Sequence, residues 1–129
     1  MDTQDRLLSM IADENIIEAI CIPTEFSIAE ILDERDTEEF SQRWMAAFNL
    51  LESQKDRMSK NQTDFSRQIR ETAYLRAFAR WKSPDLAAYV SDDFGLISDA
   101  AALAIDDPWV NGMLQSYRKG AIPCAAEEN

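Results

Sequence analysis

The sequence contains no histidine and only two cysteines, Cys21 and Cys124. Without histidine, neither a Ser-His nor a Cys-His pair can form, which excludes two common routes to nucleophilic catalysis. The glycine-rich and G-x-S-x-G motifs of phosphate-binding proteins and serine hydrolases are also missing. The cysteines have no CxxC spacing, so we expect two reduced thiols in a cytoplasmic protein.

Glycine and proline are scarce as well, with three and four residues in the chain. This scarcity argues against a turn-rich β sandwich. The N-terminal stretch lacks a basic region followed by a long apolar core, so we expect no signal peptide. No apolar run approaches the roughly 20 residues needed to span a bilayer, so we expect no membrane segment.

What the chain does have is apolar surface: 46% of its 129 residues are hydrophobic. A chain of this size forms one ordinary domain with a real core, here residues 1–129. Ser83-Pro84-Asp85 and Asp107-Pro108 are typical helix starts, and Gly120 is a typical stop. Together these signals predict helices over 84–105 and 108–119.

The region upstream predicts further helices. One should run from about 37 to about 59, followed by a turn at 61–63 and a second helix to about 82. In the segment 3–34, residues 4–12 look helical, as does the stretch to residue 34 after Ser27, while 15–22 between them could be helix or a short strand. The predicted fold class is all-α: a single compact domain of five or six helices, mostly antiparallel neighbours because the connections are short.

Apolar residues at spacings of three, four and seven mark the helix faces that should form the core. Two of the predicted helices, 37–59 and 84–105, supply these residues. The predicted core comprises Phe40, Trp44, Phe48, Leu51, Leu86, Val90, Phe94 and Ile97.

Charge is both strongly acidic and segregated. The chain has 24 acids and 13 bases, a net charge of −11. Residues 1–40 carry a net charge of −10, residues 41–82 one of +5 and residues 83–129 one of −6. Free nucleic acid is a poor partner because phosphates require a basic surface. A basic protein partner is favoured electrostatically, although the charge could also serve solubility alone.

The helix predicted over 84–105 has a second face of mixed character. At about 100° per residue, acids and apolar residues seven apart run side by side along it. This acidic strip is a candidate partner-binding surface, in which Tyr and aliphatic side chains anchor and carboxylates select a basic partner. Alternatively, the N-terminal helix packs over Tyr89, Leu96 and Leu103 and buries that side. The strip comprises Asp85, Tyr89, Asp92, Leu96 and Asp99.

Asp92 and Asp93 are adjacent in sequence but should point about 100° apart on a helix. Adjacent helical residues do not face each other, which argues against a two-carboxylate reaction centre. Asp93 should lie at the edge of the core and therefore need a cationic partner. The candidates are the arginines of the preceding helix, namely Arg70, Arg76 and Arg80.

Other acids leave a metal-dependent hydrolase open as an alternative. A magnesium or calcium site needs several oxygen ligands that converge. The spacing of these acids does not give the paired acidic motif of helical nucleotide pyrophosphatases, so we expect no metal and no cofactor. The acids concerned are Glu30, Asp33, Glu34, Glu38 and Glu39.

The basic helix combines Arg67 and Arg70 with Tyr74, Phe78 and Trp81. Arginine and aromatic residues together can stack nucleic-acid bases. In an acidic chain, however, we expect these rings to pack in the core under arginine stems.

A small, acidic, cytoplasmic chain without a catalytic constellation is similar to the small bacterial immunity and antitoxin proteins, which block a toxin by binding it. This resemblance is one of overall character and rests on no motif. We therefore expect a non-enzymatic protein-binding module, for example an immunity- or antitoxin-like neutraliser of a basic protein. The alternatives are a metal-dependent hydrolase and a structural subunit of a homo-oligomer.

Overall fold

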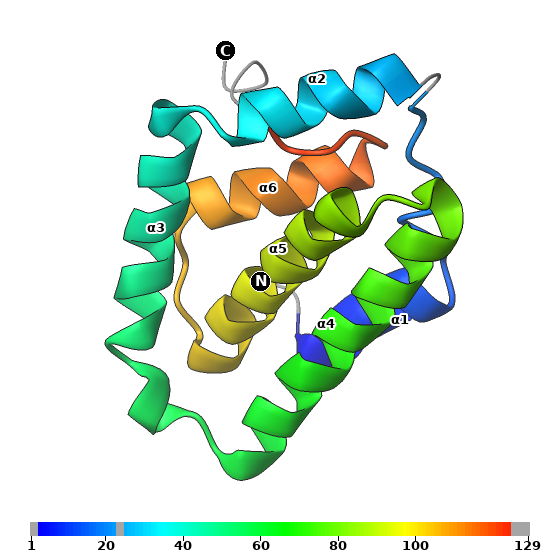
Figure 1. The fold of residues 1–129 in the computed structure, drawn as a ribbon. Helices are drawn as coiled ribbons and strands as arrows, with labels where there is room; N and C mark the ends of the chain where they lie inside the picture. The colour runs from blue at the N-terminus through cyan, green and yellow to red at the C-terminus, as the bar shows by residue number, and fades with distance from the viewer. Residues whose placement is uncertain (1–2, 23–24, 125–129) are drawn as a thin grey trace.

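The structure is a computed structural model that describes residues 3–22 and 25–124. It is all-helical, with 75% helix and no strand among the described residues, which confirms the predicted fold class. Six α-helices and one 3₁₀ turn follow one another along these residues (Figure 1). They are α1 (Gln4–Ala12), α2 (Glu25–Arg35), α3 (Glu38–Glu52), η1 (Lys55–Arg57), α4 (Lys60–Trp81), α5 (Pro84–Leu103) and α6 (Pro108–Arg118).

Local capping explains where the later helices begin. The hydroxyl of Ser83 accepts a hydrogen bond from the Leu86 amide, and Pro84 follows at the first helical position. Asp107 caps α6 in the same way, accepting from two backbone amides. Ser59 and Gln62 form a reciprocal capping box at the start of α4. Each cap satisfies backbone donors that a helix start leaves open.

The predicted helix over 37–59 is too long. α3 ends at Glu52, and the turn falls at residues 53–59 rather than at 61–63, which lie inside α4. The Ser53 hydroxyl donates to the carbonyl of Leu50, a local bond that competes with helix continuation. Residues 15–22 form turns, neither helix nor strand, and Asn15 has a positive φ of 56°.

α5 is the central helix, flanked by α3 on one side and α4 on the other (Figure 1). Eleven of its residues are buried, among them Phe94 and Val90 at 0% exposure. α1 packs against both α4 and α5, while α6 and the end of α2 approach α5 near α3. α5 therefore lies between α3 and α4, which do not pack closely on each other.

Six of the eight predicted core residues are buried, which confirms the register of α3 and α5. Trp44 and Phe48 are only partly buried, so that part of the core prediction is wrong. Their rings stack on each other at a centroid distance of 5.6 Å along the side of α3 that faces α5. The six predicted core residues that are buried are Phe40, Leu51, Leu86, Val90, Phe94 and Ile97.

No helix in the described part of the chain is both long enough and apolar enough to cross a membrane.

Candidate partner-binding site

Asp93 is the centre of a buried polar network. It is 0% exposed and accepts two hydrogen bonds from the guanidinium of Arg35, at 2.7 and 2.8 Å. The indole N–H of Trp44 donates to the same carboxylate at 3.0 Å, and the Tyr117 hydroxyl donates at 2.6 Å. One side chain of α5 thus joins α2, α3 and α6. Such a fully bonded carboxylate fixes the elements that bond to it.

Burial and charge oppose each other at Arg35. Burial alone would lower the pKa of its guanidinium, but the charge of Asp93 and the bonds to it raise that pKa above the ordinary value. The guanidinium also lies against two rings, 4.4 Å from the Phe40 centroid and 4.9 Å from the Tyr89 centroid. Burial, and then the nearby charge of Asp93, raises the pKa of Tyr117, which keeps its hydroxyl a donor.

The predicted partners of Asp93 were wrong, although the need for an arginine was right. Arg76 bonds to Glu18 and to the carbonyl of Ala12, and Arg80 bonds to the carbonyl of Ile20. The stem of Arg70 covers Gly95, where an added Cβ would lie 2.5 Å from its Cδ. Arg76 and Arg80 thus bond to the end of α1 and the segment after it, and only Arg70 reaches α5, whereas Asp93 bonds to α2, α3 and α6.

A hollow of about 360 Å³ opens directly over this network, between α3 and the first half of α5. Its lining includes parts of the Arg35 and Phe40 side chains, but its outer walls come from other residues. α3 contributes Ser41, Trp44 and Met45; α5 contributes Tyr89 and Asp92; the junction of α2 and α3 contributes Asp36. Met45 is 44% exposed, a high value for a large apolar side chain. The lining of the hollow therefore combines large apolar side chains of α3 with two carboxylates, Asp36 and Asp92.

The two acids of the hollow differ in their partners. Asp36 accepts a hydrogen bond from the Tyr89 hydroxyl, which raises the pKa of that tyrosine. Asp92 accepts no hydrogen bond and has no ion pair within the described part of the chain. Burial and the neighbouring charge of Asp93 raise the pKa of Asp92, and the more distant Arg70 and Arg35 only partly offset this rise. Asp92 is thus a carboxylate whose charge the fold leaves poorly stabilised.

The acidic strip predicted from sequence is only partly a surface. Asp85 and Asp92 are exposed and Tyr89 is half-buried, but Leu96 is only 4% exposed. Asp99 accepts a bond from Ser66 at 2.7 Å and lies 3.4 Å from the ammonium of Lys55.

The structure thus brings Tyr89 and Asp92 together in the hollow and leaves Asp85 outside its lining. The expected cover by the N-terminal helix is wrong. α1 bonds instead to Ser66 and Ser98 through Gln4, and Ser98 is nearly opposite Leu96 on the α5 wheel.

Sequence reasoning missed Asp36, Trp44 and Met45 as members of the site. Trp44 was assigned to the core, and Asp36 lies at the junction of two predicted helices, where no pattern singles it out. The sequence offered one signal for Met45, because it is a large apolar residue that lies off the apolar stripe of α3. The structure leaves that side chain exposed.

No group of three or more cysteine, aspartate or glutamate side chains within residues 3–22 and 25–124 lies close enough to hold a metal ion. The acids of α2 and α3 compared above with pyrophosphatase motifs therefore form no such cluster.

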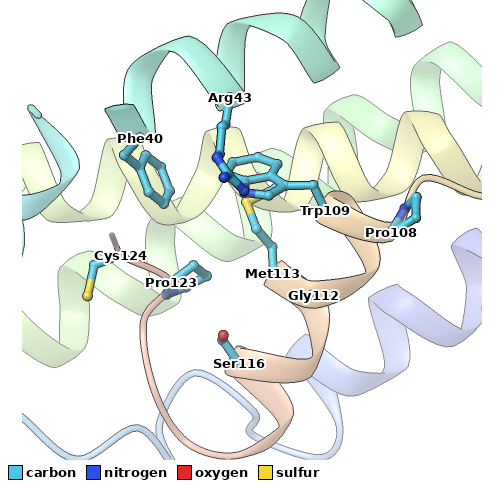
Figure 2. A pocket seen from close by; sticks show the side chains of 9 residues that line it. All are labelled: Phe40, Arg43, Pro108, Trp109, Gly112, Met113, Ser116, Pro123 and Cys124. Carbon is cyan, nitrogen blue, oxygen red and sulfur yellow. The ribbon is translucent and has the colours of Figure 1, made fainter. Parts of the chain in front are cut away.

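A second hollow, of about 260 Å³, lies on the other side of Phe40, between α3 and α6 (Figure 2). Arg43 extends from α3 across the indole of Trp109, and Met113 lies beneath them. Phe40 meets Trp109 edge to face at a centroid distance of 5.3 Å. The lining includes one cation and no carboxylate. The described lining of this hollow therefore lacks the acidic side chains that line the first hollow.

The model of the family described as immunity protein PIM1 matches residues 6–124. The chain belongs to the immunity protein PIM1 family. The match runs from α1 to the segment after α6, so it includes every element that forms the Asp93 network and the acidic hollow. No curated protein matches the chain. Membership of the PIM1 family supports an immunity-type, protein-binding role.

Proposed function

We propose that this PIM1 family protein is a non-enzymatic neutraliser that binds a toxin through the toxin's basic surface. Three features support the proposal: the family, the net charge of −11, and a hollow whose lining includes two carboxylates. The proposed partner-binding residues are Asp85, Tyr89, Asp92 and Asp99, joined by Asp36; Leu96 is left out because it is buried.

The observation that carries the proposal is the state of Asp92. A half-enclosed carboxylate beside a second carboxylate, without a bonded cation, costs stability in the free protein. A cation from a partner would remove that cost on binding. Functional sites commonly hold groups of this kind, which are unfavourable alone and favourable in the complex.

The test is to express a candidate toxin gene taken from the genomic neighbourhood of this chain, with and without the chain. We expect the chain to restore growth and the two purified proteins to form a complex. Failure to bind that toxin, or rescue without binding, would contradict the proposal.

Association kinetics then test the role of Asp92. We expect Asp92→Lys to slow association and to flatten its dependence on salt, since it reverses a charge that steers the encounter. The matched control is Glu71→Lys, which makes the same charge change at an exposed site on α4. If both variants behave alike, net charge alone explains the effect and the site assignment is wrong.

A further inference from the structure

The acidic hollow offers two kinds of contact at once. Its α3 wall presents the indole of Trp44 and the flexible thioether chain of Met45, which suit the aliphatic stem of a long side chain. The same lining includes the carboxylates of Asp36 and Asp92. A side chain that fits both must be long, apolar along its stem and cationic at its tip.

The charges around the hollow favour a cation. Arg35 lies beneath, but Asp93 pairs with it through two hydrogen bonds and offsets its charge. Arg70 approaches Asp92 from α4 without forming an ion pair, and its stem lies on Gly95. Among residues 3–22 and 25–124, Asp36 and Asp92 therefore supply acidic charge that no ion pair neutralises.

The aromatic groups narrow the choice between lysine and arginine. A guanidinium is planar, stacks on rings and donates to carboxylates in a fixed fork, whereas an ammonium is a compact, strongly hydrated charge. The protein already binds one guanidinium in this way, because Arg35 lies between the Phe40 and Tyr89 rings while it bonds to Asp93. The hollow above Arg35 offers the same kinds of group: the rings of Trp44 and Tyr89 and the carboxylates of Asp36 and Asp92.

We propose that this hollow is the receptor for an arginine side chain of the toxin, a proposal that rests on the proposed function. The guanidinium lies between Asp36 and Asp92, and the stem of the arginine packs on Trp44 and Met45. Asp92 gives the largest electrostatic contribution, because Asp36 already accepts a bond from Tyr89.

The test titrates the protein with N-acetyl-arginine amide and follows the Trp44 indole N–H and the backbone amides of Met45 and Tyr89 by NMR. The matched probe is N-acetyl-citrulline amide, which has nearly the same shape without the charge. N-acetyl-lysine amide tests the preference for a guanidinium. The variants are Asp92→Asn and, as the control that removes an exposed acid elsewhere, Glu71→Gln.

We expect saturable shifts at the hollow with the arginine probe, weaker shifts with lysine and none with citrulline. Asp92→Asn should weaken the binding about tenfold, the factor that corresponds to about 1.4 kcal/mol, while Glu71→Gln should leave it unchanged. Bound arginine should also lower the pKa of Asp92, which NMR follows through the carboxyl carbon. The other charged or titratable groups around Asp92 are Asp36, Asp93, Tyr89, Arg35 and Arg70.

Equal shifts with citrulline, or binding that Asp92→Asn leaves intact, would overturn the arginine receptor. A preference for lysine would overturn the choice of guanidinium. These outcomes are distinct from failure of the proposed function. If the toxin binds but its complex is insensitive to Asp92→Asn, the chain is a neutraliser that uses another surface.

Discussion

Asp92 and Asp93 occupy adjacent positions on α5 but have opposite surroundings. Asp93 accepts four hydrogen bonds in the core from three side chains. Asp92 has none within the described residues and lines a hollow. The prediction that the two acids point in different directions rested on helix geometry alone, and the structure confirms it. The identity of the arginine that bonds to Asp93 depended on how α2 folds back, which a local pattern does not encode.

We expect Asp93→Ala to lower the free energy of unfolding by about 3–5 kcal/mol, the usual cost of leaving a buried charge without its partner. The stranded charge is Arg35, whose side chain is only 3% exposed. Denaturant unfolding measures the loss. A double variant, Asp93→Leu with Arg35→Met, should recover much of it, because apolar pairs often replace buried ion pairs at little cost. A double variant no better than the single one would show that Arg35 is not the stranded group.

We expect Asp92→Asn to stabilise the protein at neutral pH. The folded state raises the pKa of Asp92 above its ordinary value of 3.8, so the folded protein binds this proton more tightly than the unfolded chain. Stability is therefore lost as the pH rises from 3.8 through the raised pKa, and an amide avoids that loss. The gain should be under about 1 kcal/mol because solvent screens the exposed carboxylate.

Unfolding curves at pH 7 and pH 3 measure the Asp92→Asn effect. The advantage should be present at pH 7 and disappear at pH 3, where both side chains are neutral. An advantage of equal size at both pH values would assign it to packing rather than to charge.

The elements show which sequence signals predict a boundary well. The starts of α5 and α6 follow from Ser83-Pro84 and Asp107-Pro108, because a cap acts on amides two or three residues away. The end of α3 did not follow from its apolar stripe, since that stripe reaches Met58 in sequence while the helix stops at Glu52. Apolar periodicity describes a face and contains little information on where the chain turns.

Phe94→Ala tests the register of α5. We expect a loss of about 3–5 kcal/mol in the free energy of unfolding, because the ring is fully buried and lies 4.7 Å from that of Tyr117. Denaturant unfolding provides the measurement. A loss under about 1 kcal/mol, typical of a surface site, would contradict the assigned burial.

Ala104, the residue that caps the end of α5, suggests a stabilising change. Ala104 is exposed with a φ of 56°, a left-handed conformation that disfavours any residue with a Cβ. We expect Ala104→Gly to raise the free energy of unfolding by about 1 kcal/mol.

Ala102→Gly is the matched control, two residues earlier and still inside α5. It should lower the free energy of unfolding by about 0.5–1 kcal/mol, because glycine loses more backbone freedom in a helix. Thermal or denaturant unfolding of both variants checks the pair. Changes of the same sign would contradict the assigned end of the helix.

At the scale of the whole molecule, composition predicted the class of fold. Scarce glycine and proline, helix caps and apolar periodicity all indicated helices, and the structure confirms an all-α domain. The candidate site was harder to predict, because its two walls come from residues about 45 positions apart, Trp44 and Met45 on one side and Tyr89 on the other. A helical pattern predicts which residues share a face, but not which faces meet.

We expect the melting temperature to be the same with EDTA and with added Mg²⁺ or Mn²⁺. A metal that bound only the native state would raise stability by mass action, and the described residues contain no cluster of ligands to hold one. Calorimetry or circular dichroism gives the measurement. A metal-dependent rise that is lost in Asp92→Asn would favour the hydrolase alternative over the binding module.

The Asp93 network also has a consequence for how the protein is made. Its bonds join residues 58, 49 and 24 positions apart, whereas the α4 and α5 pair is connected locally. The ribosome releases a chain from its N-terminus onward, so Arg35 and Trp44 emerge long before Asp93 and Tyr117. The full set of bonds to Asp93 can form only after Tyr117 of α6 has emerged. A chain that stops before α6 contains the whole α4–α5 hairpin but lacks the Tyr117 donor to Asp93.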